Sequence, residues 1–178
     1  MRITKSAARR AAGTMALGLA ATVAATTMPA GAANYVNTGG ELSDLLPDSD
    51  QPTDGASARL IAIPVGGSTR FFLILTGLDP EAAGTTLGAH IHVGPCVAGN
   101  GAAAGPHYNT AGGPLPADTD HEVWLDFTIR PGGFAVARTT VPFVIESGDA
   151  QALVVHALPT TPGTGVAGGR WACLPVDF

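Results

Sequence analysis

The stretch GAHIHVGPC, from Gly88 to Cys96, holds two of the five histidines of the chain and one of its two cysteines. Side chains two positions apart on a β-strand point to the same face of the sheet. His90 and His92 would therefore project together, while Ile91 points into the core. Two imidazoles on one face of a rigid strand can form half of a metal site. The alternative is a strand that carries two incidental histidines.

Two further histidines could complete such a site. His107 lies in the irregular segment 94–120, which is longer than the loops that compact domains keep without a use. His156 lies in LVVHAL, a run typical of a buried strand. Four neutral imidazoles suit Cu(II), which takes tetragonal nitrogen sites and heads the affinity order of the divalent metals. Taken alone, His156 is better explained as a hydrogen-bonded core histidine, so the prediction rests on the combination.

The segments around these histidines predict an all-β fold. The chain has 24 glycines and 14 prolines and is only 13% charged, which favours short strands joined by turns. We expect seven or eight strands and no long helix. The expected strands cover residues 58–65, 69–78, 87–93, 122–129, 134–145, 152–158 and 170–178. This pattern predicts a Greek-key sandwich or barrel.

The N-terminal residues 1–33 predict a secretory signal peptide. Four basic residues (Arg2, Lys5, Arg9 and Arg10) precede an apolar run over 11–23, and small residues follow up to a cleavage point after Ala32 or Ala33. The apolar run is too short for a good membrane span. Residues 34–57 are expected to form an acidic flexible arm that could hold a short helix at 41–46, and residues 58–178 the folded domain. The protein is therefore expected to be secreted or held in the cell envelope.

Cleavage of this signal would leave a strongly acidic protein. Residues 34–178 keep five arginines and no lysine against 14 acidic residues, a net charge of −9. Nucleic acid and anionic membranes are poor partners for such a charge, and no stable membrane insertion is expected. In an exported protein Cys96 and Cys173, 77 positions apart, are one candidate disulfide worth roughly 4–5 kcal/mol. Two free buried cysteines are the alternative.

Together these residues resemble the copper/zinc superoxide dismutases. The matching stretches are GAHIHVGPC, AAGPHYN, GDAQALVVHALP and AGGRWAC, which follow the order of that family and span residues 69–173. The resemblance implies an eight-stranded Greek-key β-sandwich or barrel of that type. It implies copper ligands at His90, His92, His107 and His156, a Cys96–Cys173 disulfide, and Cu(II)/Cu(I) cycling that converts superoxide to dioxygen and hydrogen peroxide.

The same resemblance implies that Arg170 sits beside the copper and steers superoxide. A fixed guanidinium would supply a local attraction for a small anion in a protein that repels anions overall. The alternative is a surface arginine that follows a glycine turn.

The zinc site of that family is not matched. After His107 the long loop contains only His121, which could join His107 with Asp118 and Asp120 around a zinc ion. This cluster lies in the flexible stretch PADTDH, whereas zinc needs four ligands in a defined geometry. We therefore expect copper and no zinc, with His121 a solvated residue at a strand start.

The second loop, ALPTTPGTGVAGG, is short and uncharged, which adds to the resemblance to the copper-only branch of the family. In that branch a carboxylate can replace zinc as the partner of the loop histidine. Glu122 is the first candidate and Asp126 the second, because both face away from the core, and a ligand imidazole needs its other nitrogen held. A solvated carboxylate on an outer strand face is an equal alternative.

Three functions are consistent with the sequence. The first is a copper-dependent superoxide dismutase, and the second is a non-catalytic extracytoplasmic domain that buffers or delivers copper. The third is an adhesion-type module that kept the fold and lost the chemistry, but no ligand is missing here. The first two differ in sequence only through Arg170, and the sequence does not predict the oligomeric state.

Overall fold

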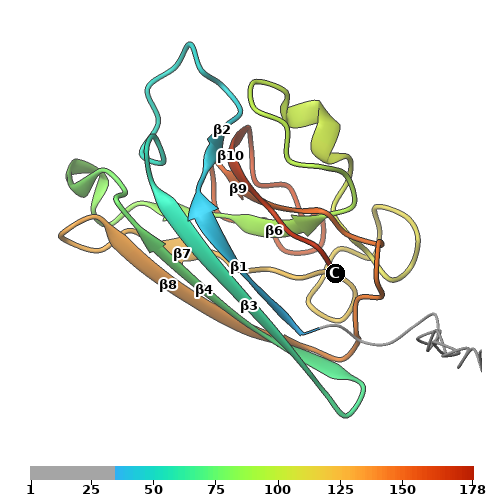
Figure 1. Ribbon diagram of the computed structural model, residues 1–178. Coiled ribbons are helices and arrows are strands. Elements are labelled where there is room, and N and C mark those ends of the chain that lie inside the picture. The colour runs from blue at the N-terminus through green and yellow to red at the C-terminus, as the bar shows by residue number, and fades with distance from the viewer. Residues whose placement is uncertain (1–34) are drawn as a thin grey trace, which may run out of the picture.

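Two four-stranded antiparallel sheets enclose the core in the computed structural model, which describes residues 35–178 (Figure 1). The first sheet has the order β1 (Val36–Glu41), β3 (Ser57–Val65), β4 (Ser68–Thr76) and β8 (Phe134–Val141). The second has the order β2 (Ser43–Asp44), β10 (Arg170–Pro175), β9 (Ala152–His156) and β6 (Ala89–His92). A separate pair joins β5 (Thr86–Leu87) and β7 (Phe127–Thr128). The all-β prediction is confirmed.

Helical structure in the described residues is limited to two short 3-10 turns, η1 (Pro80–Ala82) and η2 (Gly101–Ala104). Neither has the length or the apolar character that crossing a membrane requires.

Strands β3 and β4 of the first sheet follow directly from the sequence pattern. Buried and exposed residues alternate along β4, so that Phe71, Leu73 and Leu75 point into the core. The β3–β4 hairpin turns at Gly66 and Gly67, whose φ angles of 58° and 84° suit a two-residue turn with both central residues left-handed. The sequence placed both strands and this turn correctly.

In the second sheet, β6 and β9 are buried on both faces. Leu153 and Val155 of β9 join Ile91 of β6 in the main core. The opposite face of the same two strands carries His90, His92 and His156. This outer face is covered by the loop segments 94–120 and 157–169, and this covering decides the environment of the histidines.

The predicted flexible arm is wrong for residues 36–57. All six residues of β1 pair with β3, and β2 pairs with β10, so this segment extends both sheets instead of forming a helix at 41–46. Leu42 and Leu45 are buried. The physical reason is that distant strand edges supply the hydrogen bonds, which a polar, glycine-rich local sequence does not reveal. The predicted signal peptide lies outside the described residues.

The predicted strand at 122–129 has the expected alternation but little pairing. Val123, Leu125 and Phe127 are buried in the core, as the pattern predicted. Only Phe127 and Thr128 belong to a strand, whereas Trp124 makes an isolated bridge to His90. Glu122 and Asp126 point to the other side, toward the histidines.

Candidate metal centre

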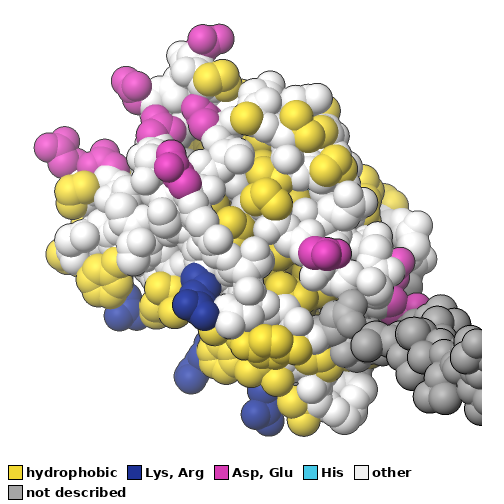
Figure 2. Space-filling view, in the orientation of Figure 1, with side chains coloured by type: hydrophobic (Ala, Val, Ile, Leu, Met, Phe, Trp, Pro, Cys, Tyr) yellow, Lys and Arg dark blue, Asp and Glu magenta, His cyan; other side chains and the backbone are white. Residues whose placement is uncertain are grey.

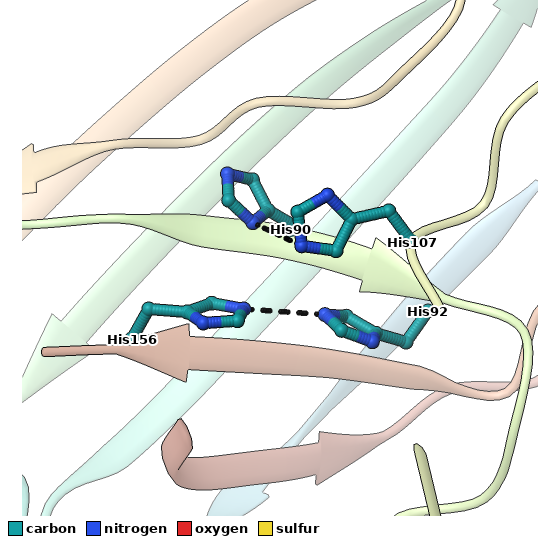
Figure 3. Close-up of side chains that lie close together, drawn as sticks. All are labelled: His90, His92, His107 and His156. Carbon is teal, nitrogen blue, oxygen red and sulfur yellow. Dashed lines mark hydrogen bonds between the residues drawn. The ribbon is translucent and has the colours of Figure 1, made fainter. Parts of the chain in front are cut away.

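The structure brings the four predicted ligand histidines into one cluster (Figure 3). One ring nitrogen from each of His90, His92, His107 and His156 lies within 4.8 Å of the others. In the part of the chain that the structure describes, this is the only group of three or more histidine, cysteine or acidic side chains with metal-binding spacing. Its members come from positions up to 66 residues apart, so the fold assembles the cluster.

Strand pairing and one loop contact position these rings. β6 and β9 are antiparallel neighbours, which puts His90 opposite Val154 and places His156 on the same face. The segment around His107 lies along the other edge of β6, where Tyr108 N–H donates to the Ile91 carbonyl at 2.8 Å and His107 forms a bridge to His92. Three rings from two strands and one from a loop therefore converge from both edges of β6.

Glu122 holds the outer nitrogen of His107. Its Oε2 lies 2.9 Å from His107 Nδ1 and accepts from Trp124 Nε1 at 2.8 Å, and its Oε1 accepts from Asn109 Nδ2 at 3.1 Å. Burial would raise the pKa of Glu122, but these three hydrogen bonds outweigh burial and lower the pKa. An ionised carboxylate accepts only, so it keeps a proton on His107 Nδ1.

Gly165 of the second loop closes over this pair. A Cβ at this glycine would lie 3.2 Å from Glu122 Oε2, and its φ of 67° is left-handed, so the close approach requires glycine. The loop that the sequence marked only as short and uncharged therefore shields the Glu122–His107 hydrogen bond.

Asp126, the second candidate partner of His107, binds Thr160 instead. It accepts from Thr160 twice, from the backbone N–H at 2.7 Å and from Oγ1 at 2.6 Å. Thr160 Oγ1 lies 2.6 Å from His90 Nε2. Because the hydroxyl proton goes to Asp126, the hydroxyl oxygen accepts the N–H of His90. No local pattern identifies Thr160, which is 70 positions from His90.

The other two rings face backbone carbonyls. His92 Nδ1 lies 3.1 Å from the Gly105 oxygen, and His156 Nδ1 lies 3.5 Å from the Gly168 oxygen. All four histidines therefore have an oxygen acceptor at the outer nitrogen, which fixes the ring tautomer and leaves the inner nitrogen unprotonated.

These inner nitrogens show that the residues fit a metal ion. His90 Nδ1 lies 3.0 Å from His107 Nε2, and His92 Nε2 lies 3.2 Å from His156 Nε2. Lone pairs that face one another at these distances are satisfied by a cation between them. Protonation is a poor substitute, because burial lowers the pKa of His90 and of His92 far below the usual value. Burial, with the charge of His107, lowers the pKa of His156 to about 4.

Arg170 lies next to this cluster at the start of β10. Its Nη1 donates to the Gly101 carbonyl and its Nη2 to the Gly105 carbonyl, both at 2.6 Å. A cavity of about 300 Å³ is lined by Arg170, His107 and His156, so a small molecule at the histidines would also meet the guanidinium. Gly105 also accepts from His92, which couples the orientation of Arg170 to that ring.

A disulfide ties the loop that carries these carbonyls to the second sheet. Cys96 and Cys173 are bonded, as predicted, with Cα atoms 5.6 Å apart. Cys173 lies in β10, three residues after Arg170. The disulfide therefore links the loop that carries the Gly101 and Gly105 carbonyls to the strand that carries Arg170.

The candidate zinc residues do not join the cluster. His121 Nδ1 and Asp118 Oδ1 are 2.7 Å apart, and 34% and 47% of these two side chains are exposed. His107, the proposed shared ligand, turns Nε2 into the four-histidine cluster and has its Nδ1 held by Glu122. Asp118, Asp120 and His121 thus show no second convergent metal site among residues 35–178.

No known protein-family model matches the chain, and no curated protein sequence matches it. Among solved structures, the fold is similar to that of a SOD-like protein from Bacillus subtilis, crystallised as a double mutant in which a tyrosine and a proline are replaced by histidine. The TM-score is 0.54 and the identity 16%, and the match covers 80% of this chain and 95% of that chain. The chain has a SOD-like β-sandwich fold. Similarity at this identity does not extend to the chemistry.

Proposed function

We propose that this protein is a secreted or cell-envelope superoxide dismutase that uses copper without zinc. The observation that carries this proposal is the convergence of four unprotonated imidazole nitrogens beside an accessible arginine. An all-nitrogen donor set favours copper among the divalent metals. The SOD-like β-sandwich fold that this chain shares with the Bacillus subtilis protein is consistent with this proposal.

His90 would hold the metal through Nδ1, and His92, His107 and His156 through Nε2, because these atoms face the centre of the cluster. When bound, copper would supply a one-electron Cu(II)/Cu(I) couple, which would oxidise one superoxide to dioxygen and reduce a second, with two protons taken from solvent, to hydrogen peroxide. The chain contributes the geometry of the ligands and the path of the anion.

Arg170 attracts and orients superoxide in this proposal. Its guanidinium is held by two carbonyls, which do not neutralise it, and it lines the cavity that reaches His107 and His156. A forked, positively charged donor fixed in place suits a diatomic anion. The net charge of −9 on residues 34–178 makes this local field more important.

Glu122 takes the place that zinc would occupy on His107. It keeps the proton of His107 on Nδ1, so that the ring presents Nε2 to the copper. A second metal at Nδ1 would have to displace a buried carboxylate that holds three hydrogen bonds. This arrangement supports the copper-only assignment.

The first test is the metal content and dismutase rate of the exported protein after loading with copper. We expect about one copper per chain and dismutation faster than that of the same concentration of free copper. A loaded protein no faster than free copper would contradict the enzymatic proposal and favour a domain that buffers or delivers copper.

Arg170→Ala separates these two functions further. It should leave the copper affinity nearly unchanged and slow dismutation by roughly tenfold or more. The loss should shrink with added salt, which screens charges beyond about 8–10 Å near 0.1–0.15 M. Arg170→Lys should recover part of the rate through its charge. Equal rates for wild type and Arg170→Ala at low salt would show that the arginine does not steer.

A further inference from the structure

The outer face of the first sheet carries most of the positive charge of the protein. Arg59 of β3, Arg70 of β4 and Arg138 of β8 all occupy outward, exposed positions, and Arg130 lies at the turn before β8. These are four of the five arginines in residues 34–178. None of the three strands contains an acidic residue. We call this surface the arginine face.

Apolar side chains are interleaved with these arginines. Four residues of the arginine face are 40–46% exposed: Phe72, Ile74, Phe134 and Val136. The strand register puts Phe72 opposite Arg138 and Ile74 opposite both Arg59 and Val136. The Arg130 guanidinium lies 5.7 Å from the centre of the Phe134 ring. Figure 2 shows blue and yellow side chains together on the lower side of the molecule, away from most of the magenta acidic groups.

Arginines bound two shallow cavities on this face. One, of about 360 Å³, lies between Arg70 and Arg138, with Phe72 and Thr140 in its lining. The second, of about 540 Å³, lies between Arg130 and Arg138. A phosphate group in either cavity would meet two guanidinium groups, the donors that bind phosphate most favourably.

The charges of these arginines are not used inside the protein. Within residues 35–178, every ion pair between a basic and an acidic side chain involves a histidine, although 14 carboxylates are available. Most acidic residues lie outside this face, four of them between positions 44 and 54, while Glu41 ends the edge strand β1 beside β3. The arginine face is therefore free to attract an external anion.

Two occupants from the same chain are disfavoured by charge. A second copy on a twofold axis would bring the arginine face against itself, cation to cation. The N-terminal segment 1–33 carries four basic residues and no acidic one, so its charge is also repelled. A protein partner would call for an apolar centre with a polar rim, whereas apolar and cationic side chains here are mixed within the same cross-strand rows.

We propose that the arginine face docks on an anionic phospholipid bilayer. The guanidinium groups would bind lipid phosphates, and Phe72, Ile74, Phe134 and Val136 would enter the boundary between headgroups and acyl chains, as apolar side chains do in interfacial anchors. The net charge of the protein opposes such binding only on average. Within a Debye length of the surface, the four local arginines determine the interaction.

Docking in this way leaves the histidine cluster accessible. The cluster lies on the face of β6 and β9 that points away from the main core, and the arginine face lies on the outer side of the first sheet. The two sheets pack on opposite sides of that core (Figure 1). The protein would sit at the membrane with its metal centre turned toward solvent. The lipid proposal does not depend on the proposed activity.

The test is co-sedimentation of the exported protein with phosphatidylcholine vesicles, with and without phosphatidylglycerol, at low and high salt. We expect binding only to vesicles that contain phosphatidylglycerol, weakened by salt. Arg70→Ser with Arg138→Ser should weaken it by at least about tenfold, since each basic residue near such a surface contributes about 1 kcal/mol. Phe72→Ser should weaken it several-fold without changing the salt dependence.

Matched variants control for net charge and hydrophobicity. Ser49→Glu with Ser147→Glu lowers the net charge by the same two units at exposed positions outside the arginine face. Leu115→Ser removes a side chain that is 61% exposed in the long loop. Both should bind like wild type.

Three results would overturn the proposal. They are no binding to anionic vesicles, binding that does not distinguish the two lipid compositions, and equal losses in the arginine and the control variants. If Arg70→Ser with Arg138→Ser alters the oligomeric state in sedimentation but not vesicle binding, a second copy covers the face instead. Circular dichroism and thermal unfolding check that each variant is folded.

Discussion

The four-histidine cluster and the Asp118–His121 pair use the same kinds of side chain in different surroundings. In the cluster, each ring donates outward, and the free nitrogens converge in a buried space. In the pair, the Asp118 carboxylate and the His121 imidazole bind each other at the surface, where neither side chain is buried. The pair is complete without a metal ion, whereas the cluster leaves four lone pairs that one cation could satisfy together. The two sites differ less in residue type than in the convergence of unprotonated ring nitrogens, which only the cluster has.

The largest expected effect comes from removing one inner nitrogen. His156→Ala should lower Cu(II) affinity by more than the roughly 10–100-fold typical for losing an outer partner of a ligand. His121→Ala is the matched control and should leave affinity unchanged. Competition titration and the electron paramagnetic resonance spectrum of Cu(II) measure both. An unchanged spectrum in His156→Ala would place the copper elsewhere.

Removing the disulfide should destabilise the side of the molecule that holds the cluster. Cys96→Ser with Cys173→Ser is expected to lower the free energy of unfolding by about 2–5 kcal/mol. The freed loop carries the Gly105 carbonyl that accepts from His92 Nδ1, so copper affinity should also fall. Denaturant unfolding of the copper-free protein measures the first effect. Two titratable thiols in freshly exported wild-type protein would show that the bond does not form.

Loss of the hydrogen bond at the outer nitrogen of a cluster histidine should lower copper affinity, whereas loss of the Asp118–His121 hydrogen bond should not. Glu122→Gln places an amide opposite His107, and Thr160→Val removes the acceptor of His90, so each should lower copper affinity by about 10–100-fold. Asp118→Asn is the control, because its imidazole partner is not in the cluster. Nitrogen chemical shifts of the copper-free protein should also show a loss of tautomer preference at His90 in Thr160→Val. If Asp118→Asn costs as much copper affinity as Glu122→Gln, the comparison fails.

The smallest effect is expected for zinc. His121→Ala should change the zinc content of the purified protein by nothing measurable, because His107 Nδ1 is occupied by Glu122. Metal analysis after dialysis measures this. Equimolar zinc that survives dialysis and disappears in His121→Ala would make the pair a true metal site and end the copper-only assignment.

Much of the cluster could be predicted from local patterns. The two-residue period of a strand placed His90 and His92 on one face, and the apolar surroundings of His156 placed it on a buried strand. That this strand is the neighbour of β6 is seen only in the structure. The outer partners were predicted less well. Glu122 and Asp126 were both candidates for His107, and the structure gives His107 to Glu122 and links Asp126 to His90 through Thr160. Which of the two carboxylates reaches His107 depends on the exact path of the loop that carries this ring. The spacing of residues in the sequence does not specify that path.

The sequence by itself determined which residues face inward, where the β3–β4 hairpin turns and which two cysteines pair. Each of these follows from alternation, from the conformational freedom of glycine or from there being only two cysteines. Only the tertiary structure decided that residues 36–44 extend both sheets, that Thr160 supports His90 and that four arginines share one face. These features depend on contacts between segments far apart in the chain. Such contacts form when the strands pair, so they leave no periodic mark in the local sequence.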